Sequence, residues 1–426
     1  MAEPLALFGG DSLNPTVPDW PVRDEREEQA VIEVIRSGNY GGFPEPGLRA
    51  GRFASAFAAM HDAAYGIACT NGTITMVTAL RAAGIDWGDE VIIPATTFVA
   101  TAWAPLSIGA IPVICDLDPE TFCIDPVVIE AAITDRTRAI IPVHLGSTIA
   151  DMDAIMTLAE QYDLIVIEDC AHAHAGQWRD RGAGSWGHFG SFSMQLTKTL
   201  TSGEGGLITT SDPDYAEACH SLIDCGRPKD DARQNFRLGA NYRITELQAA
   251  LLEVGLTRLL DQQATRARNM ADLDERLAQV DGMTPQRIDP RVTRRPGYLY
   301  ITGFDPEAFG GIDSRQFTAA LKAEGIPCGT GNPPMHRYGL LQLTERNSPV
   351  YRHHKDRLDF SSMHFPVAEH VGQTTIWVAH QYFLGGTDLM DIFVAAVDRV
   401  RAGAKRLKDH APEVIADAVW AHTNAK

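Results

Sequence analysis

The feature that most constrains the fold of this 426-residue chain is an alternation, in its first half, between short apolar runs and segments with helical spacing. Turn residues bound each apolar run, which is typical of strands buried on both faces. These runs are residues 91–94, 111–115, 139–144, 164–168, 189–194 and 207–210. Strands that alternate with helices form a largely parallel sheet, so we predict an α/β fold.

Helix ends and proline positions support this interpretation. Asp125-Pro126 combines an N-cap with a proline at the first helical position, and the helical pattern of residues 73–83 ends at Gly84. Residues 91–115 carry no charge over a length that could span a bilayer, but prolines and threonines interrupt them. We therefore expect strand, helix and strand in a soluble core there, and no membrane association.

A long helical pattern from residue 244 to about residue 280 divides the chain. The segment after it mixes strand-like runs, such as residues 298–302, with helices, such as residues 314–325, which indicates a smaller α+β domain. We predict an N-terminal segment (1–30) that packs with the small domain, a large domain (31–281) and a small C-terminal domain (282–426).

Charge and cysteine usage exclude several classes of protein. Against 37 Lys+Arg the chain has 55 Asp+Glu, a formal net charge of -18, so a nucleic-acid backbone would be repelled. The seven cysteines are scattered and form no CxxC pair, which indicates neither a disulfide framework nor a zinc site. The N-terminus does not resemble a signal peptide, and we predict a cytoplasmic protein.

Lys198 is the first lysine in the chain and one of only seven. It lies between the strand-like residues 190–194 and the glycine turn Gly203-Glu204-Gly205-Gly206. An amine at the end of a buried strand, beside flexible backbone, can be held near a carbonyl carbon as a nucleophile. The alternative is a surface lysine on a loop.

Asp169 follows the apolar strand at residues 164–168, and ligand sites of parallel sheets lie at the carboxyl ends of strands. A functional carboxylate is therefore expected there, with a helix-capping aspartate as the alternative. His172 and His174, two residues apart, would share a strand face and could, with Asp169, resemble metal ligands. No further ligand at standard spacing completes such a set, so no metal site is predicted.

Two further segments suggest ligand contacts. Thr70-Asn71-Gly72-Thr73 opens the helix at residue 73, where free backbone N–H groups favour a phosphate, although ordinary capping has the same pattern. Phe98, just after the strand at 91–94, is placed to stack on a planar ring or to pack in the core. Residues 182–187 match GxGxxG but precede a strand, so we reject a dinucleotide site there.

The order of these motifs resembles the DegT/DnrJ/StrS aminotransferase family, enzymes of fold type I that depend on pyridoxal phosphate. The resemblance covers nearly the whole chain. It rests on Ser37-Gly38-Asn39-Tyr40, Thr70 to Thr73, Pro94 to Phe98, Glu168 to Ala173, Ser191 to Lys198, Gly203 to Gly206 and Asn241 to Ala250. It implies a mainly parallel seven-stranded sheet domain, a smaller C-terminal α+β domain, and pyridoxamine phosphate as the intermediate form of the cofactor.

The resemblance also implies catalytic roles for three residues. Lys198 would hold the cofactor as a Schiff base and then move the proton between the donor Cα and the cofactor. Asp169 would pair with the pyridine nitrogen and keep the ring an electron sink. His172 would lie near one ring face or the ring hydroxyl, and Phe98 would stack on the other face.

Phosphate binding and subunit assembly follow from the same likeness. Gly72, Thr73 and Ser193 would bind the cofactor phosphate. Asn241 matches a position that contributes to the neighbouring subunit's phosphate site, which implies a homodimer with active sites at the interface. Tyr40 and Arg243 would face small-molecule substrates, with Arg243, Arg227 or Arg337 gripping the donor carboxylate.

Two branches of the family remain open at this point. Ser193-Met194-Gln195 and Thr201 to Glu204 resemble enzymes that transfer an amino group from glutamine or glutamate to the keto carbon of a scyllo-inosose-like cyclitol or keto sugar in antibiotic biosynthesis. Pro142-Val143-His144 resembles 3-amino-5-hydroxybenzoate synthases, which aromatise a ring by dehydration. In that alternative Lys198 abstracts a proton, and His144 or His336 protonates the departing hydroxyl; both histidines are also candidate substrate contacts.

Overall fold

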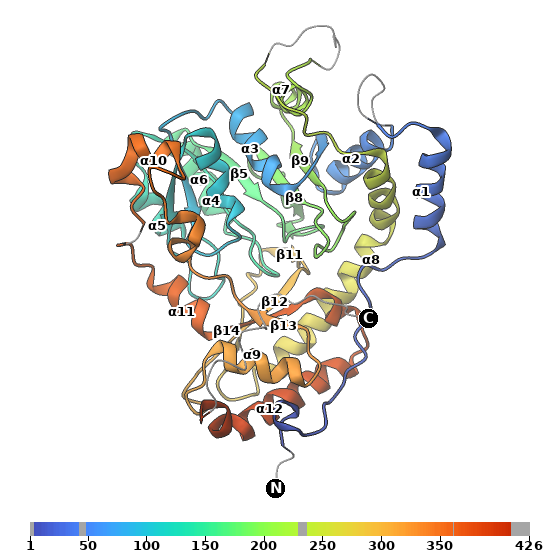
Figure 1. Cartoon of the computed structure of the whole chain (residues 1–426), viewed down its shortest axis with the longest axis vertical. Helices are drawn as coiled ribbons and strands as arrows, with labels where there is room; N and C mark the ends of the chain where they lie inside the picture. Colours follow the sequence, from blue (N-terminus) through green and yellow to red (C-terminus); the bar gives the residue numbers. More distant parts are fainter. Residues whose placement is uncertain (1–3, 42–47, 229–236, 361, 410–426) are drawn as a thin grey trace.

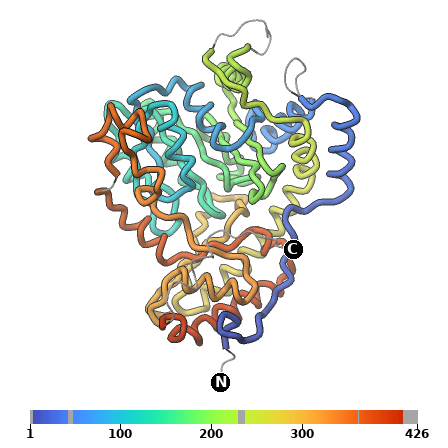
Figure 2. The backbone as a smooth tube through the Cα atoms, viewed as in Figure 1, coloured from blue at the N-terminus to red at the C-terminus, as the bar shows by residue number. Residues whose placement is uncertain are grey.

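The structure is a computed structural model that describes residues 4–41, 48–228, 237–360 and 362–409. A large α/β part lies above a smaller α+β part in Figure 1, and the yellow helix α8 (Glu246–Leu277) runs from one to the other. The tube in Figure 2 shows the blue N-terminal segment descending beside the small part, far in sequence from the red helix next to it. The fold is therefore α/β, as predicted.

A seven-stranded sheet forms the centre of the large part. Its strands lie in the order β1-β9-β8-β5-β4-β2-β3, with β8, β5, β4, β2 and β3 parallel and with β9 antiparallel to both β8 and β1. Their bounds are β1 (Tyr65–Cys69), β2 (Glu90–Pro94), β3 (Ile111–Cys115), β4 (Thr137–Ile140), β5 (Ile165–Asp169), β8 (Phe189–Ser193) and β9 (Gly206–Thr210).

Six of these strands match the apolar runs in the sequence, and the uncharged stretch at 91–115 is the predicted strand, helix and strand. The seventh strand, β1, carries an exposed Tyr65 and a glycine at position 66, so it lacks a continuous apolar run. Gly66 is required because a Cβ there would lie 2.2 Å from the carbonyl oxygen of Ala54 in α2. No helix among the described residues is long and apolar enough to cross a membrane.

Helices cover both faces of the sheet, and side-chain caps explain where several of them begin. Asn71 accepts a hydrogen bond from the Ile74 amide at the start of α3, and Asp125 accepts one from the Val127 amide at the start of α5. The helices are α1 (Glu25–Ser37), α2 (Leu48–Met60), α3 (Gly72–Ala82), α4 (Ala100–Ile108), α5 (Pro126–Ala132), α6 (Met152–Tyr162) and α7 (Pro213–Ile223).

The small part is built on a four-stranded antiparallel sheet in the order β10-β12-β14-β13. Its strands and helices are β10 (Met283–Pro285), β12 (Leu299–Phe304), β13 (Cys328–Thr330), β14 (Thr375–Ala379), α9 (Ser314–Ala323), α11 (Pro366–Thr374) and α12 (Asp388–Asp409). The N-terminal segment packs here, since Leu5 is buried in this core and the Ala6 amide donates to Glu324.

Within the predicted range of the small domain, one segment packs on the large part instead. Met335, Leu341 and Val350 are buried in the same apolar cluster as Val91 of β2, and α10 (Pro349–His354) lies beside the large sheet in Figure 1. The Met335 amide also donates to the carbonyl of Ala95 at 2.7 Å. A third sheet of β11 (Val292–Arg294), β6 (Gln177–Trp178) and β7 (Arg181–Gly182) joins the two parts.

Candidate active site

The carboxyl ends of β5 and β8 lie side by side in the sheet, because Asp169 is paired in register with Ser191. Asp169 is the last residue of β5 and is 5% exposed. It accepts hydrogen bonds from the Thr101 hydroxyl at 2.9 Å and the Ala171 amide at 3.2 Å. Burial raises the pKa of Asp169, although these two donors and the charge of Lys198 oppose the rise.

Lys198 lies in the tight loop between β8 and β9 (residues 194–205), which we call the lysine loop. The Lys198 amide donates to the Gln195 carbonyl at 2.8 Å, and the Leu196 amide donates to the carbonyl of Gly203 at 2.9 Å. Gly203 has a φ of +85°, a conformation that favours glycine and explains one residue of the glycine turn. The side chain is half-buried, and its Nζ lies 4.0 Å from the ring centroid of Tyr298.

His172 lies against the same tyrosine. Its ring centroid is 4.3 Å from that of Tyr298, with 39° between the planes, and its Nδ1 accepts a hydrogen bond from the Gly146 amide at 3.2 Å. Burial lowers the pKa of His172 well below the ordinary value for histidine, and the charge of Lys198 acts in the same direction. The imidazole is therefore neutral near pH 7, with Nδ1 as an acceptor.

The start of α3 meets the end of β8 at very short range. A Cβ at Gly72 would lie 2.6 Å from Cβ of Ser193, and a Cβ at Gly206 would lie 2.5 Å from the carbonyl carbon of Asn71. Both positions therefore need glycine. The first amides of a helix have no intrahelical acceptor, so Gly72 and Thr73 offer backbone donors beside the Ser193 side chain.

Other predicted contacts lie on the surface of the single chain. Phe98 is 60% exposed and Tyr40 is 52% exposed, so neither packs in the core. Asn241 is also exposed and pairs through its backbone with Asp224. Arg243 forms an ion pair with Asp224, and Arg227 donates to the same carboxylate at 2.7 Å.

The structure contradicts the prediction that His144 contacts substrate. His144 is fully buried, its Nε2 lies 3.0 Å from Oε2 of Glu168, and its Nδ1 accepts from the Ala150 amide at 3.2 Å. Since Nδ1 is an acceptor, Nε2 carries the proton and donates to Glu168, so neither nitrogen is available to a substrate. The same bond brings His144 and Glu168 together beside Cys170, so that one potential ligand atom of each lies within 4.8 Å of the others.

His336 is likewise buried, at 2% exposure, in contrast to the predicted substrate contact. Its Nε2 lies 3.1 Å from a Glu369 carboxylate oxygen, and its ring lies 5.2 Å from that of Phe365. The apolar packing of residues 335–360 against the large sheet draws this side chain inward. Burial lowers the pKa of His336, which favours its neutral form.

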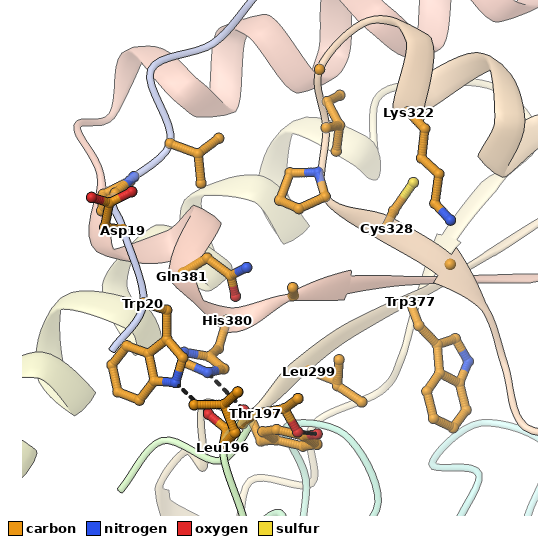
Figure 3. A pocket seen from close by; sticks show the side chains of 18 of the residues that line it. Asp19, Trp20, Leu196, Thr197, Leu299, Lys322, Cys328, Trp377, His380 and Gln381 are labelled. Carbon is orange, nitrogen blue, oxygen red and sulfur yellow. Dashed lines mark hydrogen bonds between the residues drawn. The ribbon is translucent and has the colours of Figure 1, made fainter. Parts of the chain in front are cut away.

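A cavity of about 660 Å³ lies on the small-domain side of the lysine loop (Figure 3). Its walls include Trp20, Thr197, Tyr298 and Trp377, but none of the residues predicted to bind the cofactor. The cavity therefore does not coincide with the residues predicted to bind the cofactor.

Two residues of the site were not identified from the sequence. The Thr101 hydroxyl donates to Asp169 and lies 3.1 Å from the hydroxyl of Thr97. The spacing of these two threonines, one helical turn, is the weak signal that the sequence offers for Thr101. Tyr298 contacts both Lys198 and His172 from 100 residues further along the chain. No local pattern marks it, because only the return of the chain after α8 brings it there.

A seven-stranded sheet in this order, with a buried aspartate ending one central strand and a lysine following its neighbour, is the architecture of the fold-type-I pyridoxal-phosphate-dependent transferases. The comparisons specify the family. The chain belongs to the DegT/DnrJ/EryC1/StrS aminotransferase family, whose model matches residues 21–381.

Two relatives and one solved structure are similar to nearly the whole chain. A Streptoalloteichus tenebrarius protein with the provisional name L-glutamine:3-amino-2,3-dideoxy-scyllo-inosose aminotransferase is 40% identical over 96% of this chain and 100% of its own. The L-glutamine:2-deoxy-scyllo-inosose aminotransferase of Micromonospora echinospora is 37% identical over 95% of this chain and 99% of its own. The crystal structure of 3-amino-5-hydroxybenzoic acid synthase superposes with a TM-score of 0.82 at 28% identity, over 92% of this chain and 100% of that chain.

Proposed function

We propose that the protein is a pyridoxal-phosphate-dependent aminotransferase that moves an amino group from L-glutamine or L-glutamate to the keto carbon of a cyclitol. The observation that carries this proposal is the joint position of Asp169 and Lys198 at adjacent strand ends, close enough for the lysine charge to act on the carboxylate. The names of two relatives at 37–40% identity supply the substrate class.

The described residues suit pyridoxal phosphate in two respects. A buried carboxylate held by Thr101 and Ala171 is a suitable counter-charge for a protonated pyridine nitrogen, and burial raises the pKa of this carboxyl group. The backbone of Gly72 and Thr73 can approach a phosphate beside Ser193, where any larger residue at position 72 would collide. When bound, this cofactor supplies an electron sink for the bonds at the donor Cα.

The chain's own residues then do the rest of the work. The Lys198 amine would hold the cofactor covalently until the donor amine replaces it; the released amine would then take the proton from the donor Cα and deliver it to the carbon that receives it. Neutral His172 would flank one face of the ring and Phe98 would cover the other. Asp169 would pair in its ionised form with the ring nitrogen, and the hydrogen bond from Thr101 fixes the orientation of its carboxylate.

Donor recognition is proposed to involve Arg243. This guanidinium already shares Asp224 with Arg227, so a donor carboxylate would compete with, or join, an existing ion pair. Arg337 is the less favoured candidate, because Arg243 adjoins the predicted phosphate site through its backbone bridge to Cys69, next to Thr70.

We further propose a homodimer with the active sites at the interface. Phe98, Tyr40 and Asn241 are exposed in the single chain although they flank the predicted site, as expected if a second copy covers them. A cytoplasmic location is proposed from the seven cysteines, all of which lie in the described residues as free thiols.

The test is to incubate the purified protein with pyridoxal phosphate, reduce it with borohydride and map the labelled peptide. Label on Lys198 is expected in the parent protein and in Lys322→Arg, a control at another lysine, and no label at this peptide in Lys198→Arg. Glutamine should then convert the bound cofactor to its amine form, and an added ketocyclitol should reverse the absorbance change. No conversion with any amino acid would refute the proposed reaction.

The dehydratase alternative predicts a different product, an aromatic ring that absorbs in the ultraviolet. The fold similarity to 3-amino-5-hydroxybenzoic acid synthase favours it, but at 28% identity against 40% for the cyclitol relative. The two histidines expected to serve as its acid, His144 and His336, are both buried and face carboxylates of the protein. We therefore place it second.

A further inference from the structure

Tyr298 occupies a position between three functional parts of the molecule. Its side chain is buried, at 5% exposure, just before β12 at the junction of the two parts of the chain. One contact is with the Nζ of Lys198, 4.0 Å from the ring centroid, and another is with the ring of His172 at 4.3 Å. The hydroxyl lies 2.7 Å from Oγ1 of Thr197, the residue before the lysine.

Two other side chains hold the same loop from outside the large domain. Trp20, in the N-terminal segment, donates from its indole nitrogen to the carbonyl of Leu196 at 2.9 Å. His380, in the small domain, lies with its Nε2 2.9 Å from the carbonyl of Thr197. Figure 3 shows both side chains directed at the loop, and their rings are in edge contact at 4.4 Å.

Trp20, Tyr298 and His380 thus bind the loop before the lysine at three points. Tyr298 also contacts Lys198 and His172, two of the residues predicted to bind the cofactor. Trp20, Tyr298 and His380 lie 178, 100 and 182 residues from Lys198 in the sequence, so their convergence is a product of the tertiary fold. They also line the cavity on the far side of the loop.

We propose that Tyr298 is a positioning residue for Lys198: its ring face holds the ammonium form of the lysine between two proton transfers, and its hydroxyl, with Trp20 and His380, fixes the loop that carries the lysine. This inference rests on the proposed aminotransferase function for its chemical meaning. It adds a residue of the N-terminal segment and one of the small domain to the determinants of lysine placement.

The physical reason is a difference between the two protonation states of the amine. A tyrosine ring attracts a cation through its quadrupole and attracts a neutral amine much less. Lys198 becomes an ammonium when it takes the proton from the donor Cα, and it returns to the amine when it gives that proton up. A ring at 4.0 Å therefore stabilises the proton-carrying form and limits the directions in which Nζ can point.

The variants separate the ring from the hydroxyl. Tyr298→Leu removes both, and Tyr298→Phe keeps the ring but removes the contact with Thr197. Tyr300→Leu is the control, because Tyr300 is also buried, two residues further along, but packs on Phe383 instead of the lysine. Stopped-flow absorbance with glutamine deuterated at Cα, at saturating donor, then gives the rate and the isotope effect of the first half-reaction.

We expect Tyr298→Leu to slow this half-reaction about 3- to 30-fold, with a larger isotope effect and little change in the KM for glutamine. Tyr298→Phe should keep the isotope effect of the parent protein. An unchanged isotope effect in Tyr298→Leu, or an equal change in Tyr300→Leu, would overturn the proposal, since a loss of core packing alone does not alter the proton-transfer step.

A second measurement needs no substrate and so distinguishes failure of this inference from failure of the proposed function. Amide hydrogen exchange of residues 194–200 in the cofactor-free protein should become faster in Trp20→Phe, Tyr298→Phe and His380→Ala. If the parent protein shows no reaction with glutamine but exchange accelerates, the proposed reaction is wrong and the positioning of the loop stands. Exchange that stays at the parent rate in all three variants would refute the positioning itself.

Discussion

Replacing Asp169 with asparagine should make the cofactor-free protein more stable while it weakens cofactor binding. An ionised carboxylate at 5% exposure carries a desolvation penalty of several kcal/mol. The hydrogen bonds from Thr101 and Ala171 offset part of this penalty, but the pKa of Asp169 is still raised, so burial outweighs them and we take the remaining penalty to be on the order of 1–2 kcal/mol. Asparagine removes the charge. Its amide can donate to Thr101, whose hydroxyl then donates to Thr97 at 3.1 Å.

The pH dependence has a definite sign. Because burial raises the pKa of Asp169 above its unfolded value, the penalty is fully present above the folded pKa and disappears below the unfolded value, near pH 4. Urea denaturation of the cofactor-free proteins should therefore favour Asp169→Asn by about 1–2 kcal/mol at pH 7.5, with a difference that shrinks as the pH falls.

Cofactor affinity should move in the opposite direction. Loss of the buried partner of the pyridine nitrogen costs about 3–5 kcal/mol, equivalent to about two to three and a half orders of magnitude in the apparent Kd from absorbance titration. An Asp169→Asn protein that is no more stable than its parent at pH 7.5 would refute the desolvation argument. Unchanged affinity for pyridoxal phosphate would refute the assignment of the counter-charge.

Three further outcomes follow from particular contacts. Gly72→Ala should raise the Kd for pyridoxal phosphate and destabilise the fold by about 1–3 kcal/mol, because its Cβ would collide with the end of β8; Gly51→Ala, in an open part of α2, should instead raise the urea midpoint. Thr101→Val should lower cofactor affinity while Thr101→Ser retains it, and equal titration curves would contradict the hydrogen bond to the carboxylate. His144→Ala should cost about 1.5–3 kcal/mol of stability through the loss of its hydrogen bond to Glu168, yet leave the KM for both substrates unaltered in steady-state assays.

Much of the fold was predictable because local patterns agree with the tertiary arrangement. Apolar runs in the central strands are buried on both faces, and capping residues such as Asn71 and Asp125 begin helices that pack on the sheet. β1 escaped prediction because an edge strand with an exposed tyrosine and a glycine has no such run. The excursion of residues 335–360 onto the large sheet escaped it because apolar side chains do not specify which of two cores will accept them.

The candidate active site likewise contains residues that the sequence locates and residues that it does not. Asp169 ends β5 and Lys198 follows β8, so the rule for strand ends in parallel sheets locates them. Whether a side chain faces the site or the core depends on its neighbours in space. His144 follows a strand too, but the glutamate preceding Asp169 lies within reach and binds it inside. Tyr298 was not predicted because the residues it contacts, Lys198 and His172, come from distant segments of the chain.

The 32-residue helix α8 has a consequence for how the molecule could have been assembled from parts. At about 1.5 Å per residue it is roughly 48 Å long. Leu252 and Leu259 are buried in the core of the large part, whereas Met270, Leu273 and Leu277 are buried in the core of the small part. A gene that ends at the sequence boundary near residue 281 would encode a large fragment in which Met270, Leu273 and Leu277, at the end of this helix, are exposed to water. A different small part could therefore replace this one by recombination only if its core fits the apolar side chains on the last turns of α8. The sequences of the two parts are constrained together for this reason.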